Sequence, residues 1–291
     1  MPYIHYGQIG DIWKHLPLCS ILRIEEPTHY IESNSAFARY QLEKSPEQQY
    51  GIHTFWERRK AHPALRESAY VSTLLSANPS GELNTYLGSP ALAFEILKAH
   101  QTNYTFFDLE KEALDSIQEY FDDKRIPGSL TLRKEDSRKG IKTALKDLDK
   151  DAFIFFDPYD PFDPDEFQIS LFDHFIDALK SGHRTLMWYG YASREGKVEC
   201  LDKVRASFIR HSVDKTNHTI EAVSIDLKII DQPNVKVNPG VLGCGLIAAN
   251  LCAESFQALK SESKALEQIY RGAKLFDTVS GEIRAVVEQL Y

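Results

Sequence analysis

Short apolar segments alternate with helical patterns along most of the chain. Seven segments rich in β-branched and aromatic residues predict strands, at residues 29–33, 103–110, 129–136, 152–158, 184–191, 219–229 and 245–250. Between them, apolar residues three and four positions apart predict helices, for example in KEALDSIQEYF (111–121) and ISLFDHFIDALK (169–180). This order is typical of an α/β fold whose mostly parallel sheet is covered by helices on both faces.

The interval between the first two predicted strands is too long for a single crossover helix. It spans residues 34–102 and contains two helical patterns, SPEQQYGIHTFWERRK and PALRESAYVSTLLSA, each with a proline near its first turn. We therefore predict a small helical subdomain at 46–80, inserted into a Rossmann-like domain that consists of residues 1–45 and 81–291.

Two other segments also have helical patterns. The sequence GSPALAFEILKAH predicts a crossover helix at 88–100, with Ser89 as its N-cap and Pro90 at the first helical position. Residues 251–291 predict further helices, for which the sequence indicates no other role.

The composition is that of an ordinary globular protein. Its 291 residues are 43% apolar, and no segment reaches the roughly 18 uninterrupted apolar residues that a membrane span needs. The N-terminus lacks the apolar stretch of a signal peptide and the four cysteines form no C-x-x-C pair, so we expect a cytoplasmic protein without disulfides. The net charge of -8 opposes indiscriminate binding to polyanions but leaves room for a local basic patch.

Three predicted strands end in an aspartate, at Asp108, Asp136 and Asp157. Ligands of open α/β sheets bind outside the carboxyl ends of the strands, so these residues are expected to line one rim. Such a rim suits a nucleoside-containing cofactor, because carboxylates accept hydrogen bonds from ribose hydroxyls and from an adenine amino group. An aspartate at a strand end also commonly caps a helix or a turn, and for each residue taken alone both interpretations stay open.

The segment AFIFFDPYDPF (152–162) carries the candidate chemistry. Methyl transfer to an exocyclic amine needs an acceptor for the amine hydrogens and an aromatic face on which the base stacks. Asp157 and the Pro158 carbonyl supply the first, and Tyr159 or Phe162 supplies the second. A hard-metal site in this acidic segment is the less favoured interpretation, because the spacing matches no calcium loop, and a solvated turn is a third.

Five segments together resemble the RlmJ family of 23S ribosomal RNA adenine-N6 methyltransferases, which use S-adenosylmethionine. The opening HYGQIGDIWKH is similar to the family's H-A-G-N-x-x-D-V-x-K-H, and YIESNSAFARYQL stands at the family's cofactor loop. The segments YLGSP, FIFFDPYD and LMWYGY resemble the family's Y-x-G-S-P, its catalytic D-P-P-Y and its A-x-W-Y-P strand. The resemblance implies a class I methyltransferase sheet of seven strands with a helical insertion.

Carried over by position, the resemblance assigns roles to individual residues. It implies that S-adenosylmethionine contacts His15, Asn34, Ser89, Asp108, Asp136 and Ser137. Asp157 would be catalytic, with Pro158 and Tyr159 beside it. The substrate side, with 23S rRNA as the partner, would comprise Tyr3, Lys14, Phe162, Arg58, Arg59 and Lys60, although the last three belong to a basic run that is also typical of a solvated face.

Two motifs depart from the family pattern. Alanines at 36 and 38 replace the two glycines of T-H-A-G-A-G-R-Y, and a Cβ restricts positive φ at such positions. In D-P-P-Y, Tyr159 replaces the second proline and Asp160 replaces the aromatic residue. The leading hypothesis is adenine-N6 methylation of 23S rRNA. The alternative is a catalytically degenerate relative that binds nucleic acid, including one with a role in the use of external DNA.

Overall fold

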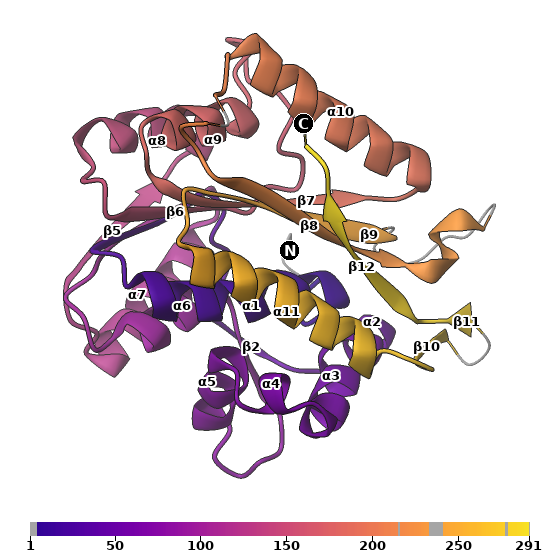
Figure 1. Ribbon diagram of the computed structural model, residues 1–291. Coiled ribbons are helices and arrows are strands. Elements are labelled where there is room, and N and C mark those ends of the chain that lie inside the picture. The colour runs from indigo at the N-terminus through magenta and orange to yellow at the C-terminus, as the bar shows by residue number, and fades with distance from the viewer. Residues whose placement is uncertain (1–4, 215, 233–240, 277–278, 291) are drawn as a thin grey trace.

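The centre of the protein is a single sheet of eight strands, in the order β12-β8-β9-β7-β6-β1-β4-β5 (Figure 1). The structure, a computed structural model, describes residues 5–214, 216–232, 241–276 and 279–290. The strands of the sheet are β1 (His29–Glu32), β4 (Asn103–Asp108), β5 (Ser129–Lys134), β6 (Ala152–Phe156), β7 (Arg184–Tyr191), β8 (Ile220–Leu227), β9 (Gly243–Ala249) and β12 (Ile283–Glu288). The seven strands expected from the sequence are all confirmed.

The strand directions define the class of the fold. Strands β5, β4, β1, β6 and β7 are parallel, and β9 is antiparallel to both of its neighbours, β7 and β8. This mostly parallel sheet agrees with the fold class that the resemblance implies. The predicted number of strands is wrong by one, because β12 lies in the C-terminal segment expected to be helical and pairs with β8 as an edge strand of the sheet.

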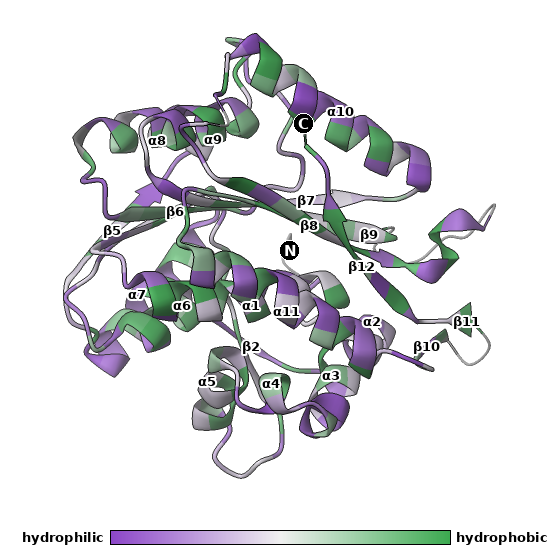
Figure 2. Ribbon diagram, viewed as in Figure 1, coloured by the Kyte–Doolittle hydropathy of each residue, from purple (hydrophilic) through white to green (hydrophobic). Residues whose placement is uncertain are grey.

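Helices cover both faces of this sheet. Figure 1 shows α8, α9 and α10 on one face, and α1, α6, α7 and α11 on the other. Hydrophobic and hydrophilic residues alternate along α10 and α11 (Figure 2), as expected for helices with one face on a sheet. The bounds of these helices are α1 (Ile9–Glu25), α6 (Ser89–Leu97), α7 (Lys111–Lys124), α8 (Ser137–Ala144), α9 (Leu171–Lys180), α10 (Arg194–Arg210) and α11 (Ala253–Ile269).

The core surrounds β6 and α1, the two elements that lead into the candidate site. All five residues of β6 are buried, because helices cover both faces of the sheet around it. Helix α1 is nearly as enclosed, since 12 of its 17 residues are buried against α5, α6, α11 and β9. Each buried phenylalanine of β6 stabilises the fold by about 1.5–3 kcal/mol. The end of β6, just before Asp157, is therefore held firmly in place.

The chain between β1 and α6 forms a ribbon and a group of short helices. The ribbon pairs β2 (Arg39–Gln41) with β3 (Thr85–Leu87), and a second ribbon, β10 (Lys274–Phe276) with β11 (Val279–Ser280), precedes β12. The short helical segments are α2 (Pro46–Gln48), η1 (Gln49–His53), α3 (Thr54–Arg58), η2 (Arg59–Ala61), α4 (Pro63–Arg66) and α5 (Ala69–Ala77).

The helical character expected of residues 46–80 is confirmed, but these helices share one hydrophobic core with the sheet. The division into two domains therefore stays a prediction. Across the described part of the chain, no helix is long and apolar enough to cross a membrane.

Candidate active site

A cavity of about 340 Å³ lies at the carboxyl ends of β1, β4 and β6. Its walls come from α1, from the loops that follow these strands, and from the N-terminus of α6. Ligands of open α/β sheets bind at this position. Among the residues expected from the sequence to form the site, the cavity brings together Lys14, His15, Asn34, Ser89, Asp108, Asp157, Pro158 and Tyr159.

The Lys14 ammonium joins two carboxylates on the wall of the cavity. Its Nζ lies 2.7 Å from Oδ2 of Asp157 and 3.0 Å from Oδ1 of Asp11. Asp11 and Lys14 are three residues apart on α1 and so share one face of the helix, whereas Asp157 reaches them from the loop after β6. Nζ also lies 5.6 Å from the centre of the Trp188 ring. Helix α1 thus delivers a buried positive charge to the candidate catalytic residue.

Burial and charge have opposite effects on Asp157. Burial raises the pKa of its carboxyl group, the Lys14 ammonium lowers it, and the carboxylate of Asp11 raises it again, which gives a pKa of about 6. Burial alone would lower the pKa of Lys14, but Asp157 and Asp11 outweigh burial and raise it. At neutral pH Asp157 is therefore mainly ionised and can accept hydrogen bonds.

The loop after β1 is fixed by the end of β4. The backbone N–H of Ser35 donates to the Phe107 carbonyl at 3.1 Å, and the N–H of Ala36 donates to Oδ2 of Asp108 at 2.8 Å. Ala36 has a φ of 55°, in the left-handed region, whereas Ala38 has an ordinary negative φ. Only one of the two alanines that replace family glycines therefore carries backbone strain, and hydrogen bonds to β4 hold the loop there.

The motif YLGSP allows the same loop to approach α6. The N–H of Gly88 donates to the Ala38 carbonyl at 2.9 Å, and a Cβ at Gly88 would overlap the Phe37 carbonyl oxygen. The expectation that Ser89 is the N-cap is wrong, because Gly88 occupies that position and Ser89 begins the helix. The Ser89 hydroxyl instead donates to the buried carboxyl group of Glu32, whose pKa burial raises well above its ordinary value.

His15 presents one ring nitrogen that has no partner. Its Nδ1 lies 2.9 Å from the Tyr86 hydroxyl, whereas its buried Nε2 has no hydrogen-bond partner among the described residues. Burial, together with the Lys14 ammonium, lowers the pKa of His15 well below its ordinary value, so the ring is neutral. His15 is therefore not a core histidine with both ring nitrogens satisfied.

Asp136, Ser137 and Phe162, all expected at the site, lie outside the lining of the cavity. The Asp136 carboxylate caps α8 by accepting the Arg138 N–H and forms an ion pair with the Arg138 guanidinium at 2.8 Å. Ser137 is buried at the start of α8. The ring of Phe162 packs 5.2 Å from that of Phe172. Cofactor contacts by Asp136 and Ser137 stay predictions. To bind the cofactor, the Asp136 carboxylate would have to give up its ion pair with Arg138.

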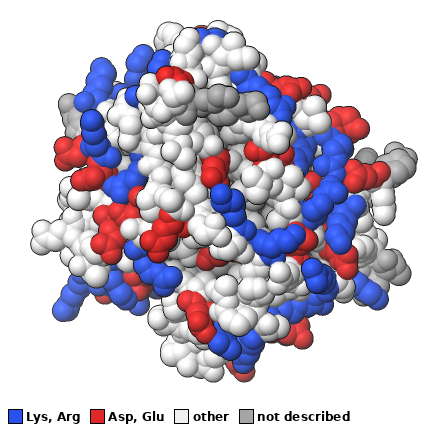
Figure 3. Space-filling view, in the orientation of Figure 1, with Lys and Arg blue, Asp and Glu red and all other residues white. Residues whose placement is uncertain are grey.

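The candidate RNA-binding run lies away from the cavity. Arg58 donates to the carbonyls of Ile269 and Arg271 at 2.9 and 3.0 Å, and Arg59 is buried with its guanidinium 3.5 Å from the centre of the Trp56 ring. Figure 3 shows basic and acidic side chains interspersed over the face in view. Lys60 is exposed and keeps its expected role as a prediction, while Tyr3 lies outside the described residues.

The acidic loop after β6 is folded by its own carboxylates. Asp160 accepts the N–H of Phe162 at 2.9 Å, and Asp165 accepts the N–H groups of Phe167 and Ile169. Asp163 and Glu166 form ion pairs with side chains at the start of α8. The Asp160 carboxylate therefore faces its own turn, and Tyr159, 90% exposed, is the aromatic residue of this loop at the cavity.

Comparisons with known proteins decide the family. Residues 25–216 match the family model described as "Ribosomal RNA large subunit methyltransferase D, RlmJ". This chain belongs to the RlmJ family. It is 24% identical over 222 residues to the "Ribosomal RNA large subunit methyltransferase J" of Escherichia coli (strain K12), over 71% of this chain and 75% of the relative.

The fold of this RlmJ-family member also has a counterpart among solved structures. A crystal structure of a protein from Legionella pneumophila str. Philadelphia 1 superposes with a TM-score of 0.74 over 98% of both chains, at 20% sequence identity. At this identity the likeness shows the fold.

The RlmJ family uses S-adenosylmethionine, and the cavity fits this cofactor. A volume of about 340 Å³ is within the usual range for small-molecule sites, and polar groups line it at several points. The unpartnered Nε2 of His15 is the most specific of these, because a buried polar atom normally has a hydrogen-bond partner. A bound ligand would supply that partner.

Several residues of the cavity wall were not predicted from the sequence, among them Asp11, Tyr6, Tyr40 and Trp188. Asp11 belongs to the motif that resembles the family but was not predicted as a site residue. Its position three residues before Lys14 indicates that both side chains lie on one face of a helix. Tyr6 and Tyr40 stack with ring centres 4.4 Å apart, and no sequence pattern links them. Trp188 lies in the LMWYGY strand, whose resemblance to the family gave the only indication.

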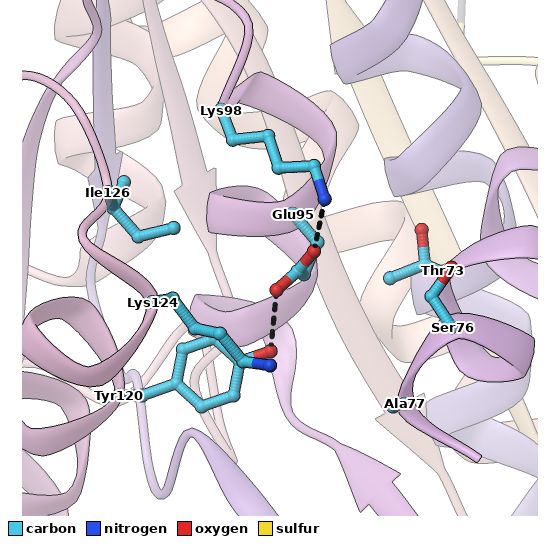
Figure 4. Close-up of a pocket in the computed structure, with 8 residues that line it drawn as sticks. All are labelled: Thr73, Ser76, Ala77, Glu95, Lys98, Tyr120, Lys124 and Ile126. Atoms are coloured by element: carbon cyan, nitrogen blue, oxygen red, sulfur yellow. Dashed lines mark hydrogen bonds and ion pairs between the residues drawn. The ribbon is translucent and has the colours of Figure 1, made fainter. Parts of the chain in front are cut away.

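A second cavity, of about 250 Å³, lies between α5, α6 and α7 (Figure 4). Its polar groups pair with one another: Glu95 forms an ion pair with Lys98 at 2.8 Å and accepts the Tyr120 hydroxyl at 2.9 Å. None of the site residues expected from the sequence lines it, so we place the candidate chemistry in the larger cavity.

Proposed function

We propose that this protein transfers a methyl group from S-adenosylmethionine to N6 of an adenine in 23S ribosomal RNA. The position of Asp157 carries the proposal: one oxygen of its carboxylate pairs with Lys14, in a cavity shared with Pro158 and Tyr159. Membership of the RlmJ family supports a ribosomal RNA substrate. The choice of 23S rRNA and of adenine N6 rests on the resemblance of FIFFDPYD to the family's catalytic motif, and protein-free or partly assembled rRNA is the expected form.

The roles of the residues follow from their hydrogen-bonding capacity. The free oxygen of Asp157 and the Pro158 carbonyl accept the two hydrogens of the amine, which draws the nitrogen lone pair out of conjugation with the ring. The exposed ring of Tyr159 stacks on the extruded base. This gives Tyr159 the role that the family motif assigns to the residue at Asp160, whose carboxylate caps its own turn.

The cofactor side of the cavity has complementary groups. Both oxygens of Asp108 accept backbone N–H groups, from Ala36 and Glu110, and a carboxylate oxygen accepts more than one hydrogen bond, which suits it to ribose hydroxyls. The N-terminus of α6, at Ser89, offers a partial positive charge to the cofactor's carboxylate. The bound cofactor supplies an electrophilic methyl group, and the chain's contribution is to orient the acceptor nitrogen in line with it.

Methyl incorporation tests the proposal. Purified protein is incubated with radiolabelled S-adenosylmethionine and unmodified 23S rRNA, in parallel with Asp157→Ala and with Asp163→Ala. Asp163 belongs to the same loop but lies at the surface, paired with Arg138, and so serves as the matched control. We expect transfer by the wild type and by Asp163→Ala and none by Asp157→Ala. Equal incorporation by all three proteins contradicts the assignment.

The alternative of a degenerate relative that binds nucleic acid without methylating rests on the two altered motifs. In the cofactor loop, Ala36 keeps the left-handed conformation that a glycine would adopt, and Asp108 holds it there. In the second motif, Tyr159 stands at the cavity. These observations favour the enzyme. Calorimetric titration separates the two: micromolar binding of S-adenosylmethionine that is lost in Asp108→Ala supports the enzyme, and absence of binding at millimolar ligand supports the alternative.

A further inference from the structure

We propose that Asp11 is a positioning residue of this methyl-transfer site, which holds the Lys14 ammonium so that one oxygen of Asp157 stays free for the substrate amine. The inference rests on the proposed function, because it concerns the same carboxylate. It adds a residue on α1 to the reaction.

The Lys14 ammonium contacts the carboxylates of both Asp11 and Asp157. Lys14 Nζ lies 3.0 Å from Oδ1 of Asp11, and it donates its hydrogen bond to Oδ2 of Asp157 at 2.7 Å. All three side chains are largely enclosed, with 10–15% of each exposed, and all three line the cavity. Enclosed charges of this kind interact more strongly than surface ion pairs, since little water screens them.

One atom of Asp11 is left over in this arrangement. Its Oδ2 is buried and has no hydrogen-bond partner among the described residues. A buried carboxylate oxygen without a partner destabilises the fold, so a contribution to stability alone does not explain an aspartate at position 11. Its charge acts on Lys14 and, through Lys14, on the orientation of Asp157.

Most of the titratable groups packed around these three residues are neutral, whereas the Asp108 carboxylate also lines the cavity but is not among the charges that shift the pKa of Asp157. On α1, burial and the Lys14 charge keep His15 neutral. On the neighbouring elements, burial raises the pKa of each acidic group well above its ordinary range, to about 12 for Cys244, so these groups hold their protons: Tyr30, Glu32, Tyr40, Tyr70, Tyr86 and Cys244. Lys14 and Asp11 are therefore the charges that set the state of Asp157.

The two charges have opposite effects on the pKa of Asp157. Lys14 lowers the pKa of Asp157, and Asp11 raises it by repulsion between like charges. The result is a carboxylate that is ionised at neutral pH yet basic enough to take a proton. In the transfer, the nitrogen lone pair forms the N–C bond, the electrons of the S–C bond return to sulfur, and the proton that nitrogen loses goes to the free oxygen of Asp157.

The test compares Asp11→Asn and Asp11→Glu with the wild type and with Asp115→Asn, an exposed aspartate on α7. The carboxyl carbon of Asp157, assigned from its absence in Asp157→Asn, is titrated by NMR. We expect Asp11→Asn to lower the pH at which Asp157 titrates by about one unit, and Asp11→Glu to preserve it. In methyl transfer we expect kcat to fall about tenfold in Asp11→Asn while the cofactor Kd changes less than twofold.

The possible outcomes separate the two proposals. Unchanged titration of Asp157 and unchanged kcat in Asp11→Asn overturn the role of Asp11. A wild-type protein that binds the cofactor but methylates no RNA overturns the proposed function, and the NMR titration still reads the effect of Asp11. If Asp11→Asn does not fold, Asp11→Glu decides the question: its longer side chain displaces Lys14, so kcat falls with the titration preserved, whereas full activity overturns the role.

Discussion

The Lys14 ammonium and the Asp157 carboxylate are 143 residues apart in the sequence and 2.7 Å apart in the structure. They are brought together because α1 packs against the sheet and Lys14 reaches the loop that follows β6. Neither α1 nor the loop after β6 would by itself indicate that the two side chains meet. The pair exists only in the fold, and it sets the protonation state of the residue to which we assign the chemistry.

Replacement of Lys14 by methionine tests this pair. Lys14 lowers the pKa of Asp157, so its loss should raise that pKa above about 6. The acid limb of the pH–rate profile for methyl transfer then moves to higher pH, and activity at pH 7 falls by about tenfold or more and recovers in part at pH 9. The control is Lys203→Met, since Lys203 lies over the Phe162 ring outside the cavity. A profile with an unmoved acid limb contradicts the coupling.

The cofactor loop offers a test of backbone strain. Ala36 adopts a φ of 55°, which costs an alanine about 1–2 kcal/mol, so Ala36→Gly should stabilise the protein by up to about 1 kcal/mol after the flexibility of glycine is counted. Ala38 is buried with a negative φ, so Ala38→Gly should destabilise it. Urea unfolding measures both. Equal effects of the two substitutions would show that the strain at Ala36 is absent.

Tyr159 should act on the RNA and not on the fold. Its side chain is 90% exposed at the mouth of the cavity, and base stacking on an aromatic residue contributes about 1–3 kcal/mol. Tyr159→Ala should therefore lower kcat/KM for RNA by roughly 5- to 150-fold without a change in Tm, whereas Tyr159→Phe should retain most activity. Phe162→Ala, the control, should lower Tm because Phe162 packs on Phe172. If Phe162→Ala impairs RNA methylation and Tyr159→Ala does not, the base stacks on Phe162 and the assignment of Tyr159 is wrong.

Glu262 makes the stability depend on pH. It is buried between α1 and α11 and accepts the Ser20 hydroxyl at 2.6 Å, and burial raises its pKa to about 8. Because the folded state holds the proton more tightly than the unfolded state, stability falls as pH rises from about 4.5 to 8 and then levels off.

Glu262→Gln should remove this dependence, which amounts to about 3 kcal/mol between pH 5.5 and 8.5. Urea unfolding at the two pH values measures the change, and Glu254→Gln, an exposed position on the same helix, is the control. A variant that loses as much stability as the wild type over this range would show that Glu262 is ionised in the folded protein.

The sequence predicts strands better where the hydrophobic pattern is unbroken. Strands such as AFIFF are apolar throughout and follow clear helical periods, so their positions are correct. β12 was missed because IRAVVE mixes charged with apolar residues and stands after a helix whose period seemed to continue, and only its pairing with β8 makes it a strand. Edge strands of this kind depend on tertiary contacts more than on local pattern.

The sequence predicted the site residues whose position follows from the end of a strand. It did not predict which side chains pair with a neighbour in the chain. Asp108 and Asp157 follow strands whose ends meet, so both reach the cavity. Asp136 follows a strand in the same way, but the Arg138 guanidinium two residues later takes its carboxylate. Arg59 was expected to contact RNA, yet Trp56, three residues earlier, covers it. Pairs between residues close in the sequence compete with ligand binding for the same side chain. The sequence alone does not show which of the two interactions forms.

The most direct measurement is mass spectrometry of nucleosides from unmodified 23S rRNA after incubation with this protein and S-adenosylmethionine. Asp157 in the RlmJ-type cavity predicts N6-methyladenosine as the product with the wild type and its absence with Asp157→Ala. Methylation at another atom, or the same amount of N6-methyladenosine with both proteins, would contradict the assignment of Asp157 to this reaction.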